Sequence, residues 1–284
     1  VNKPVATEVA NGNHVFEALK HGIDILWIGA RTSVNPFAVQ EIADALSGVD
    51  IPVMIKNPIN PDLSLWLGAI ERIEGAGISK IYAIHRGFST YEKSIYRNKP
   101  KWDIPIELKR RYPEIPLICD PSHIGGKRSL IEKIAQSAFD LNFDGLMIES
   151  HPTPNSALSD PEQQLTPIDL QNLLTKLIFR KALPAERKNA LDEYREQIDA
   201  LDYELLEILH QRMNVVKEIA KYKKESNVTI YQPNRWDKIV STRIEHAAKK
   251  GLSEKFTQNI FQSIHNESIE HQSEIMNAKK VVKS

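Results

Sequence analysis

The 284 residues carry 37 basic and 37 acidic side chains. This balance creates no global field that would attract nucleic acid or an anionic membrane, so we expect neither as a partner. The single cysteine excludes an intrachain disulfide and fits a reducing cytoplasm, and no apolar run reaches the roughly 18 residues of a membrane span. Eleven of the 12 glycines precede residue 146, which predicts a turn-rich first part and a mostly helical second part.

Short apolar runs recur along the first part of the chain, and each predicts a buried β-strand. They are Pro4–Val9, Ile23–Ile28, Ile51–Ile55, Ile78–Ile84, Ile115–Ile118 and Asp144–Ile148. Helical patterns lie between several of them, at His14–His21, Pro36–Leu46, Asp62–Glu74 and Lys127–Asn142. The alternation of strand and helix predicts a parallel sheet. Because the runs are apolar throughout, both faces of that sheet should be covered.

Each predicted strand ends in a polar side chain. These residues are Glu8, Arg31, Lys56, His85 with Arg86, His123 and Glu149. In an α/β barrel the active site lies at the carboxyl ends of the strands. The cations among them suit a substrate that carries phosphate and carboxylate, which arginine can bind with two parallel hydrogen bonds.

The segment 118–126 reads Ile-Cys-Asp-Pro-Ser-His-Ile-Gly-Gly. Its Asp-Pro pair should end the strand, because proline cannot donate to a β-ladder, and the two glycines predict a tight turn before the next helix. A simple turn with an incidental histidine is the alternative interpretation. In the functional interpretation, His123, Glu149 and Asp160 form a nitrogen and oxygen ligand set of the kind that holds a divalent transition metal.

Six motifs together resemble the 3-deoxy-D-arabino-heptulosonate 7-phosphate (DAHP) synthases, in the branch that includes the octulosonate-phosphate synthases. They are Ile28-Gly-Ala-Arg31-Thr, Ile55-Lys56-Asn-Pro, Ile84-His85-Arg86-Gly87-Phe, Cys119-Asp-Pro-Ser-His123-Ile-Gly-Gly, Met147-Ile-Glu149-Ser-His151 and Ser159-Asp160-Pro-Glu-Gln163-Gln164-Leu165. The resemblance covers residues 1–176. It implies a (β/α)8 barrel that condenses phosphoenolpyruvate with erythrose 4-phosphate.

The same resemblance implies roles for the polar residues. Arg31 and Arg86 would hold the phosphate of phosphoenolpyruvate, and Lys56 its carboxylate. His123, Glu149 and Asp160 would bind the metal, commonly Mn²⁺, which polarises the aldehyde of erythrose 4-phosphate.

Two motifs of that family are absent from the sequence. One is Gly-Pro-Cys-Ser, which supplies a fourth metal ligand, and the other is Lys-Pro-Arg-Thr, which contacts both substrates. We therefore expect a barrel that lacks its first two units, a fragment of a longer polypeptide, and little synthase activity until upstream residues are restored. Cys119 lies inside a predicted strand and is interpreted as a buried thiol rather than the missing ligand. An octulosonate-phosphate synthase is the alternative function for this part.

The second part contains no proline or glycine from about residue 186 to 225, and its apolar residues recur in heptad spacing. One register holds Leu191, Ile198, Leu205 and Ile219; the other holds Tyr194, Leu201, Ile208, Val215 and Tyr222. This pattern predicts a long helix of coiled-coil character. At 1.5 Å per residue it would extend for roughly 60 Å. Such a helix needs partners along its length, so we expect a homodimer.

Two further helices are predicted, at Arg235–Lys250 and Glu254–Met276, the last with Ser253 as its N-cap. Arg212 interrupts the apolar stripe of the long helix, where a charge is costly unless it is paired. It either extends outward to solvent or belongs to an anion site between helices. On the third helix the stripe Ile260, Ile264, Ser268 and Gln272 changes from apolar to hydrogen-bonding, which favours a buried polar ligand.

These three helices resemble the all-helical chorismate mutases, with a resemblance that covers residues 186–276. The family's polar residues fall in order on Arg195, Arg212, Lys223, Arg235, Ser268 and Gln272. The resemblance implies that Arg212 and the neighbouring protomer's copy of Arg195 bind the two carboxylates of chorismate. Lys223 and Gln272 would donate to its ether oxygen, and no cofactor is needed to form prephenate.

The remaining positions of this predicted site, Arg235 and Ser268, would complete the pocket. Gln232 and Trp236 stand where the family often has the acids Asp and Glu, which usually contact the substrate hydroxyl. This departure predicts a weaker contact with that hydroxyl and slower turnover.

The sequence as a whole therefore predicts a bifunctional cytoplasmic enzyme of aromatic biosynthesis, with a synthase at residues 1–180 and a mutase at residues 186–284. A second hypothesis makes the helical part a regulatory module that senses prephenate or chorismate. The joining segment 177–185 has four large apolar residues and no Gly or Ser, unlike a flexible linker. We therefore expect it to pack on one or both domains and to allow prephenate, bound at Arg212, to inhibit the synthase.

Overall fold

The computed structural model describes residues 3–91, 93–180, 188–231 and 233–278. The chain divides into two compact units, Val1–Ala182 and Leu183–Ser284. Each unit has its own internal packing.

Unit 1 is built on one parallel sheet in which the strands follow the chain order. The strands are β1 (Ala6–Val9), β2 (Ile25–Ile28), β3 (Val53–Lys56), β4 (Ile81–His85), β5 (Leu117–Cys119) and β6 (Gly145–Leu146). All six predicted strands are confirmed, although each begins later than predicted. In the described part of the chain β1 and β6 pair only with β2 and β5, so the sheet is open and does not close into a barrel.

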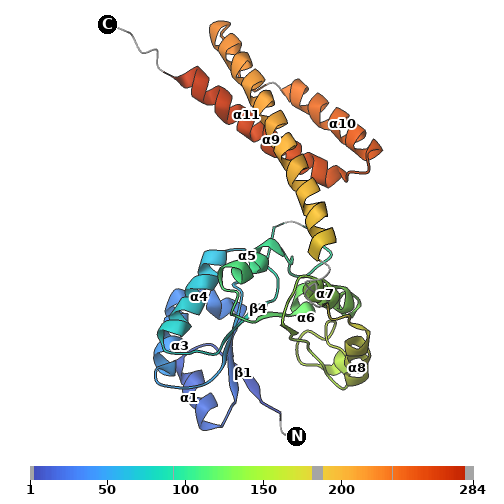
Figure 1. Cartoon of the computed structure of the whole chain (residues 1–284). Coiled ribbons are helices and arrows are strands. Elements are labelled where there is room, and N and C mark those ends of the chain that lie inside the picture. Colours follow the sequence, from blue (N-terminus) through green and yellow to red (C-terminus); the bar gives the residue numbers. More distant parts are fainter. Residues whose placement is uncertain (1–2, 92, 181–187, 232, 279–284) are drawn as a thin grey trace, which may run out of the picture. The chain divides into compact units, whose positions relative to one another are not determined.

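Helices follow the strands and pack against them (Figure 1). They are α1 (Gly12–Lys20), α2 (Ala30–Ser33), α3 (Pro36–Leu46), α4 (Leu63–Gly75), α5 (Asp103–Arg111), α6 (Pro121–Gly125), α7 (Arg128–Asp140), the 3₁₀ turn η1 (Pro154–Ser156) and α8 (Pro167–Lys176). The four predicted helices correspond to α1, α3, α4 and α7. Local sequence explains their starts: Asn35 caps α3 just before Pro36, and Asp62 caps α4 by accepting from the Leu65 amide.

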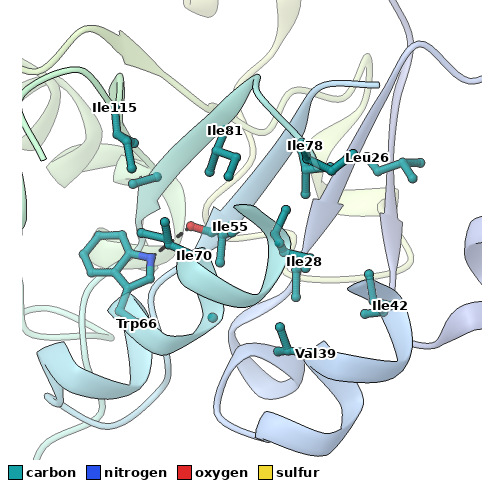
Figure 2. Packing of buried hydrophobic residues seen from close by; sticks show 14 of the residues in the cluster. Leu26, Ile28, Val39, Ile42, Ile55, Trp66, Ile70, Ile78, Ile81 and Ile115 are labelled. Atoms are coloured by element: carbon teal, nitrogen blue, oxygen red, sulfur yellow. Dashed lines mark hydrogen bonds between the residues drawn. The ribbon is translucent and has the colours of Figure 1, made fainter. Parts of the chain in front are cut away.

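The core of unit 1 lies between the sheet and helices α3 and α4 (Figure 2). Ile28 and Ile55 from the strands meet Ile42 and Ile70 from the helices, and all four side chains are fully or almost fully buried. The indole N–H of Trp66 donates to the carbonyl oxygen of Ile55 at 3.2 Å, so this large ring is buried without an unpaired polar group. This packing fixes the carboxyl ends of β2, β3 and β4, which carry the polar residues.

Unit 2 consists of α9 (Lys188–Glu225), α10 (Pro233–Lys249) and α11 (Glu254–Asn277), which confirms the three predicted helices. Helix α11 packs along α9 and against α10 (Figure 1). Ser253 caps α11 as predicted, by accepting from the Phe256 amide. Asn227 and Gly251 have φ angles of 53° and 77°, and these left-handed residues follow the ends of α9 and α10.

The residues that α9 buries against the rest of unit 2 lie beside the predicted heptad registers. Val216 and Ala220 are the buried residues on that helix, whereas Leu205, Val215 and Ile219 of the heptad registers are 52%, 60% and 43% exposed. Most of the predicted heptad stripe is therefore left open within the chain. None of the helices in the part of the chain that the structure describes is long and apolar enough to cross a membrane.

Candidate functional site

A basic cavity of about 440 Å³ lies at the carboxyl edge of the unit 1 sheet. Its lining includes Glu8, Trp27, Arg31, Lys56, Arg86, Arg97, Asn98, His123 and Asp160. Parallel pairing places the ends of β1 to β5 on this edge, so the polar residues that end these strands converge as expected. Gly29 also lines the cavity. A Cβ at this position would collide with the Glu8 carboxylate, so the close approach of Glu8 requires glycine.

Three guanidinium groups share this cavity. Burial lowers the pKa of Arg86, and the positive charges of Arg97 and Arg31 lower it further, while Asp120 opposes the change. Arg86 is oriented by Asn98, whose Oδ1 accepts from its guanidinium at 2.9 Å, and by Asn57, whose Oδ1 accepts from its backbone N–H at 2.7 Å. Because like charges held this closely repel one another, the cavity favours an anion such as a phosphate.

Lys56 reaches the same cavity but is held by a carboxylate. Its Nζ lies 2.8 Å from Oδ2 of Asp120, and it lies 4.5 Å from the centre of the Trp27 ring. Burial alone would raise the pKa of Asp120, but hydrogen bonding to His123 and the charge of Lys56 outweigh it and hold that pKa at about 2. Asp120 is therefore ionised and is shared by Lys56 and His123.

The three predicted metal ligands come together beside the cavity. His123, Glu149 and Asp160 each offer one ligand atom, and these atoms lie within 4.8 Å of one another. Nε2 of His123 lies 3.4 Å from Oε1 of Glu149, and its Nδ1 lies 2.8 Å from Oδ2 of Asp120. A carboxylate behind the second ring nitrogen is the common arrangement for a metal-binding histidine. One imidazole and two carboxylates fit a divalent cation.

Gln163 connects these ligands, although the sequence motif that contains it predicted no role for it. It is 1% exposed, and its amide nitrogen donates to Oε2 of Glu149 at 3.0 Å. Its oxygen accepts from Arg97 at 2.8 Å, and Arg97 also pairs with Asp160 at 2.8 Å. Asp160 has a φ of 48°, a left-handed conformation that is uncommon outside glycine and that often marks functional positions.

Sequence reasoning missed Arg97, Asn98, Asp120 and Gln163 as site residues. Arg97 and Asn98 lie in the irregular segment after β4, where no periodic pattern shows their direction. The only available signal was the polar pair in Tyr96-Arg97-Asn98. Their position depends on backbone hydrogen bonds from Arg97 and Asn98 to the carbonyls of Gly125 and Ile124.

The structure shows the local conformation at the end of β5 and in the segment that follows it. His123 does not lie in a simple turn: it is part of the short helix α6, which Asp120 caps by accepting from the His123 amide at 3.0 Å. Gly126, with a φ of 64°, then ends that helix. Cys119 is 0% exposed within the core cluster, which confirms the buried thiol. Burial raises the pKa of this thiol.

In unit 2, Arg212 on α9 lies against the polar residues Ser268 and Gln272 of α11. Arg212 donates to Oγ of Ser268 at 2.7 Å, so this partly buried side chain faces α11. Ser268 and Gln272 are 4% and 8% exposed, and the Gln272 amide donates to the Ser268 carbonyl at 3.1 Å. Burial lowers the pKa of Arg212, and the charge of Arg243 on α10 adds to this. Arg243 is a second cation near these polar residues that sequence reasoning missed.

The other predicted mutase residues are placed less closely together. Lys223 donates to the carbonyl of Ile230 at 2.6 Å, and burial lowers its pKa. Arg195 is 62% exposed in its side chain and pairs with Asp192, 17 residues or about 25 Å along α9 from Arg212. Gln232 lies outside the described residues, as does the side chain of Arg235.

Comparisons with known proteins assign both units. Residues 1–181 match the sequence model of the DAHP synthetase I family, and residues 194–273 match that of chorismate mutase type II. Phospho-2-dehydro-3-deoxyheptonate aldolase of Thermotoga maritima is 32% identical over 142 residues, which are 50% of this chain and 40% of that protein. For the helices, 4-amino-4-deoxychorismate mutase of Streptomyces venezuelae is 34% identical over 77 residues, 27% of this chain and 75% of that protein.

A solved structure agrees with the first assignment. A truncated form of 3-deoxy-D-arabino-heptulosonate 7-phosphate synthase from Thermotoga maritima superposes with a TM-score of 0.54 and 27% identity. The match covers 70% of this chain and 66% of that one, so the chain spans less than two thirds of the synthase relatives. The chain therefore belongs to the DAHP synthetase I family, and its helical unit is a chorismate mutase type II domain.

Proposed function

We propose that unit 1 binds phosphoenolpyruvate and takes part in its condensation with erythrose 4-phosphate to give DAHP. The observation that carries this proposal is the cavity in which Arg31, Arg86 and Arg97 lie beside the cluster of His123, Glu149 and Asp160. A cationic cavity next to a metal-type ligand set suits a phosphorylated acid and an aldehyde substrate.

The proposed roles of these residues differ according to their charge. Arg31 and Arg86 bind the phosphate of phosphoenolpyruvate, and Lys56 binds its carboxylate once the substrate competes with Asp120. His123, Glu149 and Asp160 hold a divalent metal, for which we propose Mn²⁺. When bound, such a cation supplies Lewis-acid polarisation of an aldehyde oxygen. Asp120 and Gln163 orient the ligands, and Asn57 and Asn98 orient Arg86.

Substrate binding tests this proposal without relying on turnover. Titration of the chain with phosphoenolpyruvate in the presence of Mn²⁺ should show saturable binding. Arg86→Gln should weaken that binding at least about tenfold, because it removes a charge-assisted bidentate contact. Arg110→Gln, a change in an exposed ion pair with Glu107, should leave the affinity unchanged. Equal affinities in the two variants would contradict the assigned cavity.

Turnover separates the synthase from its octulosonate relative. In a form of the protein with activity, phosphoenolpyruvate should be consumed faster with erythrose 4-phosphate than with a five-carbon aldose phosphate. An octulosonate contains three carbons from phosphoenolpyruvate and five from the aldose, so the reverse preference would replace the proposed substrate.

We also propose that unit 2 converts chorismate to prephenate in the cytoplasm, without a cofactor. Buried Ser268 and Gln272 on α11 and partly buried Arg212 on α9 form a polar group between these helices. Such a group can hold a flexible dianion in its reactive shape and stabilise charge on the breaking ether bond. Loss of chorismate turnover in Arg212→Ala tests this assignment. Turnover should be retained in the control Glu218→Ala, because Glu218 is exposed and pairs only weakly with Lys221 at the surface of α9.

A homodimer is part of this proposal. Tyr194, Ile198, Leu201, Leu205 and Ile208 on the first half of α9 are all more than half exposed. A largely apolar pocket of about 440 Å³ lies between α10 and α11, lined by Leu252, Phe256, Ile260 and Phe261 among others. A row of exposed apolar side chains of this kind marks an interaction site. In an antiparallel pair, α9 of the partner would bring its Arg195 to Arg212.

Prephenate inhibition of the synthase is the proposed link between the two activities. The first residues of the joining segment pack on α7, which supports the expectation for that part. Leu177 is buried there, the backbone of Ile178 exchanges hydrogen bonds with Gln136, and Phe179 contacts Phe139. Helix α7 in turn packs against α6, which carries His123. Residues 181–187, including Leu183, lie outside the described residues.

The regulatory proposal requires different affinities of prephenate for two states of the enzyme. A coupling of about 1–3 kcal/mol corresponds to about 5-fold to 150-fold. Inhibition by prephenate, expressed relative to each variant's own uninhibited rate, should disappear in Arg212→Ala and when residues 177–185 are replaced by a long Gly/Ser linker. If both variants are inhibited as strongly as the parent, prephenate binds elsewhere. If prephenate inhibits but chorismate is not turned over, unit 2 is a sensing module.

A further inference from the structure

An imidazole occupies a fixed position beside the polar stripe of α11. The ring of His265 stacks on the indole of Trp236 from α10, with 4.0 Å between ring centroids and 21° between planes. The ring of Tyr231 lies 6.2 Å away, tilted against the imidazole. Stacked contact with a large aromatic ring limits the rotation of the imidazole, so its nitrogen atoms point in defined directions.

The position of His265 on α11 aligns it with the proposed mutase residues. Ser268 and Gln272 follow it at three and seven residues, which places all three on one side of the helix. Arg212 donates to Ser268 on that side. Burial lowers the pKa of His265, and the nearby charge of Arg212 lowers it further, so the imidazole is neutral at physiological pH.

Two buried polar atoms on this side of α11 have no hydrogen-bond partner among the residues that the structure describes. They are Nε2 of His265 and Oε1 of Gln272. Buried polar atoms in proteins are almost always paired, and each unpaired one needs an explanation. Here two such atoms lie on the side of α11 to which the Arg212 guanidinium donates. Together they indicate a polar ligand that would form hydrogen bonds with them.

We propose that His265 is a substrate-binding residue of the mutase site, and that its Nε2 hydrogen-bonds an uncharged polar group of the dianion that Arg212 binds. Trp236 is the positioning residue that holds the imidazole. A neutral imidazole matches a hydroxyl group, whereas the carboxylates of a dianion are matched by guanidinium groups. This inference rests on the proposed mutase function and adds one contact to it.

Two substitutions separate hydrogen bonding from packing. His265→Phe keeps an aromatic ring against Trp236 and removes the nitrogen, whereas His265→Gln keeps a polar group of similar reach. In the full-length chain, kcat/KM for chorismate should fall about 10-fold to 100-fold in His265→Phe, mainly through KM, and less in His265→Gln. His271→Phe, on the same helix but paired with Glu267, should keep the parent value. Equal kinetics in the parent and His265→Phe would overturn the proposal.

A measurement on the parent protein covers the case in which His265→Phe does not fold. The ¹⁵N chemical shift of His265 Nε2 should change when prephenate is added, and an unchanged shift under saturating prephenate would overturn the proposal. The two proposals remain distinguishable. A parent chain that neither turns over chorismate nor binds prephenate would disprove the mutase function, whereas an active parent with an unaffected His265→Phe variant would disprove only the role of His265.

Discussion

Lys56 and Asp120 form an ion pair at 2.8 Å, and their side chains are 4% and 1% exposed. The pair joins the end of β3 to the residue that follows β5, so it connects strands that are not neighbours in the sheet. Two charges buried this deeply are stabilised by one another, and removal of one leaves the other without compensation.

Asp120→Asn should therefore reduce the free energy of unfolding by about 3–5 kcal/mol, because Lys56 would remain buried without its counter-charge. Urea denaturation at neutral pH measures the effect. Asp50→Asn is the matched control, since Asp50 pairs with Lys80 at the surface, where both side chains are more than half exposed, and it should cost less than about 1 kcal/mol. Similar losses in the two variants would show that Lys56 finds another partner.

Gln163→Met should weaken Mn²⁺ binding about 10-fold to 100-fold, as observed for residues that orient metal ligands. The substitution keeps the length of the side chain but removes the amide that donates to Glu149 and accepts from Arg97. Electron paramagnetic resonance of free Mn²⁺ measures the affinity directly. Gln164→Met is the neighbouring control because its amide bonds only the Ser159 carbonyl at the surface. Parent-like affinity in Gln163→Met would mean that the ligands are held in place by other contacts.

The stability of the protein should fall in mildly acidic solution because of His85. This residue is enclosed by Trp66, Phe88, Trp102 and Phe143, and burial lowers its pKa from 6.5 to about 3. Between these two values the unfolded chain binds a proton that the folded chain does not, so unfolding becomes easier as the pH falls. Above pH 6.5 the contribution of His85 to the free energy of unfolding is constant. Below pH 6.5 the free energy of unfolding falls by up to about 1.4 kcal/mol per pH unit.

His85→Phe removes this titration and suits an aromatic enclosure. Its stability relative to the parent should therefore rise as the pH is lowered from 7.5 to 5, while a control variant at the exposed His21, His21→Gln, should follow the parent. Chemical denaturation at each pH gives the difference. A difference between His85→Phe and the parent that does not change with pH would mean that His85 is already protonated or accessible in the folded state.

A mixture of Arg195→Ala and Arg212→Ala proteins should recover chorismate mutase activity that neither variant shows alone. The two side chains lie about 25 Å apart along α9, too far to bind one small dianion within one chain. In a heterodimer, one of the two composite pockets would contain both arginines. Mixing after mild denaturation and refolding, with native mass spectrometry to count heterodimers, provides the test. Inactive mixtures that contain heterodimers would disprove the composite site.

Much of this protein follows from local sequence. Short apolar runs such as Ile51–Ile55 predict strands, and all six predicted strands are present. The long helix without proline or glycine and the Ser253 cap were equally predictable. The polar residues at the strand ends indicated a site because parallel strands bring these ends to one edge.

Only the tertiary structure decided which side chains complete and orient that site. Asp120 and Gln163 are bonded to residues that lie far away in sequence, as in the pair of Asp120 with Lys56 and that of Gln163 with Arg97. Arg97 lies in an irregular segment, where side-chain direction has no periodicity. On α9, heptad spacing marked one apolar stripe, but only packing showed that Val216 and Ala220, beside that stripe, are the residues this helix buries. Periodicity reports which residues avoid water, whereas the choice of partner depends on contacts between distant parts of the chain.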